Sequence, residues 1–262
     1  MKIGILYIAT GKYSCFWQEF YSTAEKFLFT DEEKHYFVFT DSEDVKGENV
    51  TVIPRVCQGF PADSLFRFEM FLSIRPELEK MDYVYFFNSN LVFTEKVDAE
   101  LIPDAKHNFL LGALNPMESI RKYPVMLFTY ERNKKSLAYI PPYQKEPYHY
   151  YMGGLNGGRV REFLQMCETL AENIRIDYQN GIIARFHDES HINRYFRDFP
   201  PLILGREFSV FEGWNLKIPR KVMFRDKMKI SADFQKNKIS TTAKIIRIFR
   251  KFLSGVCWYA KL

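Results

Sequence analysis

Apolar positions recur with two different periods in the first third of the chain. Short runs of β-branched and aromatic residues predict strands at residues 3–9, 36–40, 50–53 and 83–87. Apolar residues at helical spacing predict helices over residues 16–28 and 65–72, with Pro76 ending the second segment. Strands that alternate with helical crossovers favour an α/β fold, with a parallel-rich sheet covered on both faces. Ligands bind beyond the carboxyl ends of such strands, so the loops after Ile8 and Phe87 are the first places to search for chemistry.

The second half of the chain is less regular. A predicted helix over residues 160–173 follows a run rich in tyrosine and glycine, and residues 229–242 form a polar stretch that predicts a linker. Apolar residues and cations interleave over residues 243–257 in a pattern that gives a helix an apolar face flanked by positive charge. We therefore expect one catalytic domain over residues 1–230, followed over residues 231–262 by a basic linker and an amphipathic tail.

Composition narrows the class of protein. The chain has 262 residues, of which 47% are hydrophobic and 17% aromatic, which excludes disorder over most of it. No apolar run reaches the roughly 18 to 20 residues that span a bilayer, and residues 1–8 are too short for a secretory leader. The cysteines at positions 15, 57, 167 and 257 are far apart and indicate neither a zinc site nor a disulfide framework, so a reducing cytoplasm fits best.

The net charge of +5 is unevenly distributed. Residues 217–262 carry a charge of +11, and residues 1–216 carry −6. A basic cluster of this kind indicates an anionic partner, which is a phosphorylated substrate, a membrane surface or, least in keeping with the rest of the chain, nucleic acid.

Polar side chains follow the strand predicted at residues 83–87. In nucleotide-sugar transferases a D-x-D motif at such a strand end holds the divalent cation that neutralises the donor diphosphate. Here the triplet is Asn88-Ser89-Asn90, and an amide offers a hard cation only a neutral oxygen. A strand-terminating turn is the simplest interpretation of the triplet alone.

A second polar group lies at residues 186–193. Asp188 and Glu189 could supply a nucleophile or base for glycosyl chemistry, in which an oxocarbenium-like transition state needs a nearby negative charge. His187 and His191 have the spacing of a zinc-binding helix, but no clear third ligand follows. Acidic residues at a helix start are the simpler alternative.

A third motif, YYMGGLNGG, covers residues 150–158. Its glycines let the backbone approach a ligand and its tyrosines can stack on sugar rings, although a glycine-rich turn before a helix explains it equally well.

Together these motifs resemble those of glycosyltransferase family 6, which includes the ABO blood-group transferases, the α-1,3-galactosyltransferases and Forssman synthase. The resemblance runs over residues 2–229 and also includes Lys12-Tyr13, the YFVFTD run at 36–41, the RFEM run at 67–70 and residues 128–141. It implies a GT-A fold, a single Rossmann-like nucleotide-sugar-binding domain with a mixed central sheet flanked by helices. It also implies retaining transfer of galactose or N-acetylgalactosamine from a UDP-sugar to the 3-hydroxyl of an acceptor galactose.

Motif positions carry family roles onto this sequence. Glu189 matches the candidate nucleophile and also borders the acceptor. The resemblance implies donor-binding roles for Ile8, Thr10 and Tyr13 at the uridine, Arg67 between sugar and nucleotide, Asp188 at the sugar hydroxyls, and Asn88, Ser89 and Asn90 beside the diphosphate. Acceptor-binding roles are implied for Phe186, His187 and Asn115, the last of which replaces a histidine found in some relatives.

The segment Met152-Gly153-Gly154 bears on the donor sugar. Family members with glycine at the position of Gly154 accept N-acetylgalactosamine, and those with alanine favour galactose. A methyl group at Gly154 would occupy volume near the C2 substituent of the sugar. We expect UDP-GalNAc as the donor, with UDP-galactose as the alternative because Met152 accompanies alanine in the galactose users.

The amides at Asn88 and Asn90 predict catalysis without a metal ion or other cofactor. The diphosphate charge would then be balanced by basic residues over 217–229, which we expect to close over UDP, with Arg225, Lys227 and Lys229 as donor-binding residues.

The expected acceptor is fucosyl-α-1,2-galactose, as in the ABO branch. Relatives in animal cells carry an N-terminal membrane anchor, whereas this chain begins at its first strand, so we expect a bacterial-type cytoplasmic enzyme. Residues 243–257 are predicted to contact the anionic inner face of the membrane, with a disordered tail as the alternative. The alternative function is a glycan- or nucleotide-sugar-binding relative that lost catalysis together with the metal-binding carboxylates, and no nucleic-acid partner is expected.

Overall fold

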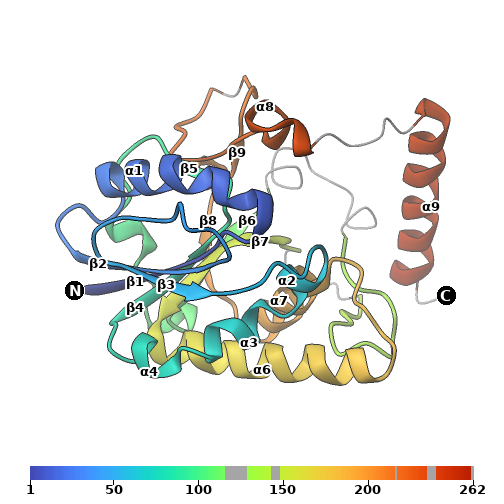
Figure 1. Ribbon diagram of the computed structural model, residues 1–262. Helices are drawn as coiled ribbons and strands as arrows, with labels where there is room; N and C mark the ends of the chain where they lie inside the picture. Colours follow the sequence, from blue (N-terminus) through green and yellow to red (C-terminus); the bar gives the residue numbers. More distant parts are fainter. Residues whose placement is uncertain (116–128, 143–147, 216, 235–239, 261–262) are drawn as a thin grey trace.

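A mixed sheet organises the protein (Figure 1). The computed structural model describes residues 1–115, 129–142, 148–215, 217–234 and 240–260. Over these residues the main sheet has seven strands in the order β3-β2-β1-β4-β7-β6-β8. Its strands are β1 (Lys2–Ile8), β2 (Glu33–Thr40), β3 (Val50–Pro54), β4 (Tyr83–Phe87), β6 (Leu110–Leu114), β7 (Tyr151–Arg159) and β8 (Leu202–Leu204). The strands β3, β2, β1 and β4 are parallel, β7 is antiparallel to β4 and β6, and β8 is parallel to β6. The predicted α/β class and the strands predicted in the first third of the chain are confirmed.

Helices cover both faces of this sheet. The covering helices are α1 (Trp17–Phe27), α2 (Ala62–Leu65), α3 (Arg67–Leu72), α4 (Arg75–Leu78), α6 (Val160–Gln179) and α7 (His187–Asp198). The short 3₁₀ helices are η1 (Gly11–Phe16), η2 (Ala99–Leu101), η3 (Ala105–His107), η5 (Arg206–Phe208) and η6 (Ala232–Phe234). In Figure 1, α1 lies on one face of the sheet, and α3 and α6 lie on the other.

Alternation along the strands divides the apolar core into two layers. Ile5 and Tyr7 of β1 pack with Trp17 and Phe20 on the α1 side. Leu6 faces the opposite side and joins the cluster of α3, α6 and α7. The buried part of β1, residues 3–7, is therefore a continuous apolar run, as expected for a parallel strand covered on both faces.

A smaller sheet carries the segments that follow β4 and precede the tail. It has three strands in the order β5-β10-β9, namely β5 (Leu91–Phe93), β9 (Val210–Phe211) and β10 (Val222–Phe224). The helices α8 (Lys227–Ile230) and α9 (Thr241–Tyr259) follow it. Searched over the described ranges, no helix is long and apolar enough to cross a bilayer.

Several sequence predictions need correction. The helix expected over 65–72 is interrupted at Phe66, and Pro76 lies in the first turn of α4, where its missing N–H leaves no hydrogen bond unmade. The helix expected over 160–173 continues to Gln179. Part of the expected linker is ordered, because Phe234 of η6 packs against Tyr13 with ring centroids 5.1 Å apart.

The glycine-rich run is a strand and not a turn. It forms β7 in the middle of the sheet, between β4 and β6. A Cβ atom at Gly157 would lie 2.5 Å from the carbonyl oxygen of Val84, so a larger residue there would separate β7 from β4. The glycines in the second half of the motif therefore serve the pairing of strands.

Candidate active site

A cavity of about 650 Å³ opens where β4 ends, β7 begins and α7 has its first turn. It lies beyond the carboxyl end of β4, as expected for an α/β sheet. The residues that line it are Phe60, Ser64, Arg67, Asn88, Thr129, Gly153, Gly154, Arg185, Phe186, His187, Asp188, Glu189, Arg247, Ile248 and Lys251. The structure thus brings together the predicted residues Arg67, Asn88, Gly153, Gly154, Phe186, His187, Asp188 and Glu189.

Glu189 is fixed in the wall of this cavity by two hydrogen bonds. The hydroxyl of Tyr150 donates to Oε1 at 2.6 Å, and the backbone N–H of Gly153 donates to Oε2 at 2.7 Å. The surrounding protein desolvates the carboxyl and raises its pKa to about 7, while both donors favour the charged form. Glu189 therefore has a fixed orientation and changes its charge close to neutral pH.

Asp188 and Arg67 form a buried ion pair beside Glu189. Nη2 of Arg67 lies 3.0 Å from Oδ2 of Asp188, and the guanidinium stacks 4.3 Å from the ring centroid of Phe86. Burial raises the pKa of Asp188, and the positive charge of Arg67 opposes that rise. Over the residues that the structure covers, Nε and Nη2 of Arg67 make no hydrogen bond, because the contact with Asp188 is close but poorly aligned. Buried N–H groups of this kind are suited to an anionic ligand.

His187 begins α7 in a left-handed conformation, with φ of 50°. A non-glycine residue adopts this region rarely, so the backbone at the mouth of the site is strained. Its ring lies edge-on to Phe60 with centroids 4.8 Å apart. His191 does not line the cavity; burial lowers its pKa to about 4, and its Nε2 lies 3.6 Å from Asp177. No third metal ligand joins the two histidines within the described ranges, where no cluster of three His, Cys, Asp or Glu occurs.

The amides of Asn88 and Asn90 bind each other. Nδ2 of Asn88 donates to Oδ1 of Asn90 at 3.1 Å, and Oδ1 of Asn88 accepts the N–H of Ser89 at 3.1 Å. Ser89 and Asn90 are buried, and only Asn88 lines the cavity. Both amide oxygens are already hydrogen-bonded, and Nδ2 of Asn90 donates to the carbonyl of Arg225 at 2.8 Å.

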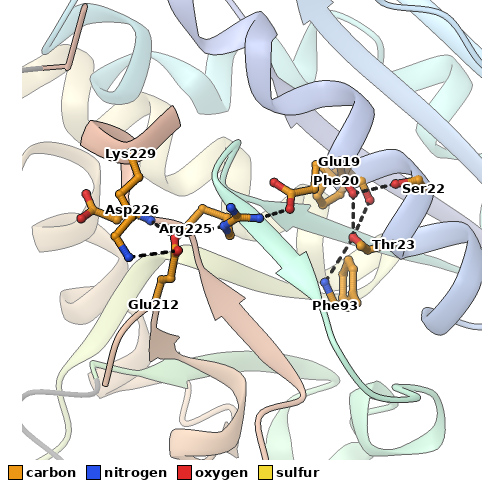
Figure 2. A network of polar contacts seen from close by, with 9 residues as sticks. All are labelled: Glu19, Phe20, Ser22, Thr23, Phe93, Glu212, Arg225, Asp226 and Lys229. Atoms are coloured by element: carbon orange, nitrogen blue, oxygen red, sulfur yellow. Dashed lines mark hydrogen bonds and ion pairs between the residues drawn. The ribbon is translucent and has the colours of Figure 1, made fainter. Parts of the chain in front are cut away.

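Among the predicted basic residues, Arg225 lies next to this turn. The side chains of Arg225 and Lys229 contact acidic residues (Figure 2). The backbone N–H of Arg225 donates to the carbonyl of Asn90 at 2.8 Å. Nε of Arg225 lies 3.1 Å from Glu212, its Nη1 pairs with Glu19, and Nζ of Lys229 lies 3.2 Å from Glu212. Lys227 stacks over the ring of Tyr13 at 4.6 Å. Arg225, Lys227 and Lys229 do not line the cavity in this conformation.

The remaining predicted residues lie outside the cavity lining. Ile8, Thr10 and Tyr13 lie at and just beyond the carboxyl end of β1, and Oγ1 of Thr10 donates to Asp63 at 3.2 Å. Met152 is buried in the core on the α1 side. The backbone N–H of Asn115 donates to the carbonyl of Tyr150 at 2.8 Å, and the residues that follow it lie outside the described ranges.

Neighbouring glycines of β7 face different parts of the site. A Cβ atom at Gly153 would lie 3.3 Å from Oδ2 of Asp188 and 3.3 Å from Cβ of Glu189. A Cβ atom at Gly154 would lie 3.2 Å from Cβ of Asn88 and 3.3 Å from the ring of Phe224. Both positions are therefore too tight for a side chain without movement of a neighbour.

Several site residues were not found from the sequence. Tyr150 belongs to the glycine-rich motif, but its bond to Glu189 depends on how β7 meets α7. Arg247, Ile248 and Lys251 come from α9, far along the chain. Trp258 holds α9 in place by donating from Nε1 to the carbonyl of Ile140 at 2.7 Å, a contact that no local pattern signals.

Comparison with known proteins gives a consistent result. The sequence model of glycosyltransferase family 6 matches residues 1–240. The O-antigen biosynthesis glycosyltransferase WbnI of Escherichia coli is 31% identical over 230 residues, which are 87% of this chain and 95% of that protein. Globoside alpha-1,3-N-acetylgalactosaminyltransferase 1 of Mus musculus is 29% identical over 84% of this chain, and histo-blood group ABO system transferase 1 of Rattus norvegicus is 33% identical over 79%.

The matched region covers 63% of the mouse protein and 60% of the rat protein. The family match covers nearly the whole chain, from β1 to the segment before α9, and includes every element that lines the cavity except α9. The chain belongs to glycosyltransferase family 6.

Proposed function

We propose that the protein is a retaining α-1,3-glycosyltransferase that moves N-acetylgalactosamine from UDP-GalNAc to the 3-hydroxyl of a galactose acceptor, without a metal ion. The observation that carries the proposal is the carboxylate of Glu189, held in the cavity wall by Tyr150 and Gly153. A glycosyl transfer with retention needs such a group close to the anomeric carbon, where positive charge develops as the leaving group departs.

The bond that breaks joins the anomeric carbon to the β-phosphate oxygen of UDP, and its electron pair leaves with UDP. Glu189 stabilises the cationic anomeric carbon from the opposite face of the sugar. The acceptor 3-hydroxyl then forms the new bond on the face that UDP has left, and its proton passes to the departing phosphate. Configuration is thereby retained.

Gly154 supports N-acetylgalactosamine as the sugar. A methyl group there would press on Asn88 and on Phe224, at the wall that borders the donor in this proposal. The name of the mouse relative, an N-acetylgalactosaminyltransferase, agrees with this choice. The resemblance to the ABO branch favours fucosyl-α-1,2-galactose as acceptor, in contact with Phe186 and His187.

Charge balance at the diphosphate is assigned to protein cations. Arg67 has N–H groups without hydrogen-bond partners among the described residues, and it lines the cavity. Arg225 adjoins the Asn88–Asn90 turn through its backbone, and Arg225 and Lys229 would both exchange Glu212 for phosphate oxygens when UDP-GalNAc binds. The Asn88–Asn90 turn supports the same view, since its amide oxygens are neutral and already hydrogen-bonded.

The test is release of UDP from UDP-GalNAc and from UDP-galactose, each with and without fucosyl-α-1,2-galactose, in excess EDTA. The proposal expects acceptor-dependent turnover of UDP-GalNAc and a loss of at least about a hundredfold in Glu189→Gln. Glu162→Gln, a surface change that breaks only the pair with Arg159, serves as the matched control. Turnover that appears only with Mn²⁺ would reject the metal-free mechanism, and saturable binding of UDP-GalNAc without any turnover would identify a binding protein.

A further inference from the structure

We propose that α9 docks the enzyme onto an anionic lipid bilayer through its outward apolar face, which places the mouth of the cavity at the membrane surface. The statement about the cavity rests on the proposed function, whereas the docking itself does not.

One side of α9 is fixed to the protein. Trp258 is 7% exposed and packs against Tyr130 and Tyr148, with ring centroids 6.1 Å apart in each pair. Ser254, one turn earlier, accepts a hydrogen bond from Nη1 of Arg132 at 3.0 Å. These contacts fix which face of the helix points away from the protein.

The opposite side is apolar and exposed. Ile245, Phe249, Phe252 and Leu253 recur at helical spacing on this side and are between 38% and 62% exposed. A folded protein rarely leaves so many large apolar side chains of one helix in water, and such a patch marks an interaction site.

Charge identifies the occupant as a lipid surface. The sequence of α9 contains Lys244, Arg247, Arg250 and Lys251 and no acidic residue. Arg247 and Lys251 line the cavity, so they lie on the side of α9 that faces the protein, and the exposed apolar side is opposite to them. A helix with an apolar side and a basic side matches an acyl layer beneath anionic headgroups, and its charges prevent it from crossing the bilayer. This agrees with the absence of any spanning helix in the part of the chain that the structure describes.

The same helix borders the cavity. Arg247, Ile248 and Lys251 are part of its lining, so a helix lying in the headgroup layer would bring the cavity to the lipid surface. Acceptor glycans carried on lipids would then reach Glu189 by diffusion in two dimensions. The inference therefore deepens the proposed function by assigning a lipid-linked class of acceptor.

The experiment uses the full chain with vesicles of phosphatidylcholine, alone or mixed with about one third phosphatidylglycerol. We expect sedimentation with the mixed vesicles and about tenfold less with neutral ones. Changing Ile245→Glu and Phe249→Glu together should weaken binding to mixed vesicles about tenfold. The matched control is Val52→Glu, an exposed apolar position on β3, which should bind like the wild type.

Added mixed vesicles should also slow amide hydrogen exchange in α9 of the unaltered chain, a readout that requires no variant. Equal binding by the double variant, absence of vesicle binding, or a dimer that the double variant makes monomeric would each overturn the proposal. Turnover of a soluble acceptor should stay within about twofold in the double variant. Vesicle binding without any turnover would leave the docking standing and reject the proposed function.

Discussion

At the scale of single residues, the chemistry of Glu189 is set by groups from other elements. Its motif supplies the carboxylate, whereas the donors come from the start of β7 and from Tyr150 just before it. Without them, desolvation alone would favour the neutral acid. The hydrogen bonds therefore decide how much of the enzyme carries the charged form near neutral pH.

The pH profile tests this assignment. Because Glu189 acts as a carboxylate and its pKa is about 7, kcat/KM should rise with pH through about 7 and level off above it. In Tyr150→Phe the charged form loses a donor, so its pKa rises and the midpoint moves to higher pH. Tyr178→Phe, an exposed position, should leave the midpoint unchanged. An identical midpoint in Tyr150→Phe would show that Glu189 does not control the profile.

The two glycines of β7 predict separable effects. Gly154→Ala should lower kcat/KM for UDP-GalNAc by about tenfold relative to UDP-galactose, because the methyl displaces Asn88 or Phe224 at the donor wall. In Gly153→Ala the methyl group presses on Asp188 and Glu189, so kcat/KM should fall by a similar factor for both donors. Competition between the two donors, analysed by mass spectrometry of the product, measures the ratio. An equal loss of kcat/KM for both donors in Gly154→Ala would show that this residue does not determine the choice of donor sugar.

At the scale of elements, the turn after β4 shows how neutral residues can replace a charged pair. Two aspartates in place of Asn88 and Asn90 would repel each other across the 3.1 Å contact. Changing both to Asp should lower the melting temperature by about 3–6 °C, and Mn²⁺ should restore it. The wild type is the control, with a melting temperature that Mn²⁺ leaves unaltered. A double variant that melts alike with and without Mn²⁺ would refute this account of the turn.

The segment from β9 to α8 makes the exchange at Glu212 testable. Glu212→Gln weakens the hold on Arg225 and Lys229, so KM for UDP-GalNAc should fall by about threefold. Arg225→Met should raise it. Glu100→Gln breaks a comparable pair with Lys221 away from the cavity and should not change KM. If Glu212→Gln and Arg225→Met alter only the melting temperature and leave KM unchanged, the ion pairs of Glu212 have a structural role and do not bind the donor.

The elements differ in how far local sequence determines them. The strands β1, β2 and β4 and the helix α1 follow from short-range periodicity, because each buries residues that the pattern marks. The edge strand β3 follows from the same pattern although none of its residues is buried. The strand β7 could not be predicted, since glycines do not contribute to a periodic pattern of apolar residues. Its extended conformation depends on pairing with β4 and β6, which lie on either side of it. The cavity around Glu189 could be assembled only from the family resemblance. Even so, the resemblance missed Tyr150 and Arg185, whose places depend on tertiary packing.

At the scale of the whole molecule, the cavity joins elements that are distant in the sequence. Phe60 precedes α2, Glu189 belongs to α7 and Lys251 to α9. Only the amphipathic character of residues 243–257 could be predicted, and these residues lie in the helix α9. The attachment of α9 through Trp258 depends on long-range packing, which no local pattern signals. The predicted boundary between a catalytic domain and a tail at residue 230 stays a prediction.

Trp258→Ala should therefore act on the active site from a distance. Loss of the buried indole would release α9, and KM for the acceptor should rise by about fivefold or more, with a smaller change for the donor. Hydrogen exchange of α9 should accelerate in parallel. Trp258→Phe keeps the packing without the hydrogen bond to Ile140 and should lie between the two. Unchanged exchange and unchanged KM in Trp258→Ala would show that α9 does not complete the site.

The pleat of β7 places two adjacent residues, Gly153 and Gly154, in different parts of the site. Gly153 faces the carboxylates of α7, and Gly154 faces Asn88 and Phe224, because successive positions of a strand point to opposite sides. If Gly154 borders the donor sugar as proposed, point substitutions there can diversify sugar preference while the contacts of Gly153 with α7 are preserved. Changes of length are far less permissive: a slip of one residue would exchange the two neighbourhoods and break the bond from Asn88 N–H to Gly154 O. We therefore expect the donor sugar to change through substitutions in β7 and not through insertions in this strand.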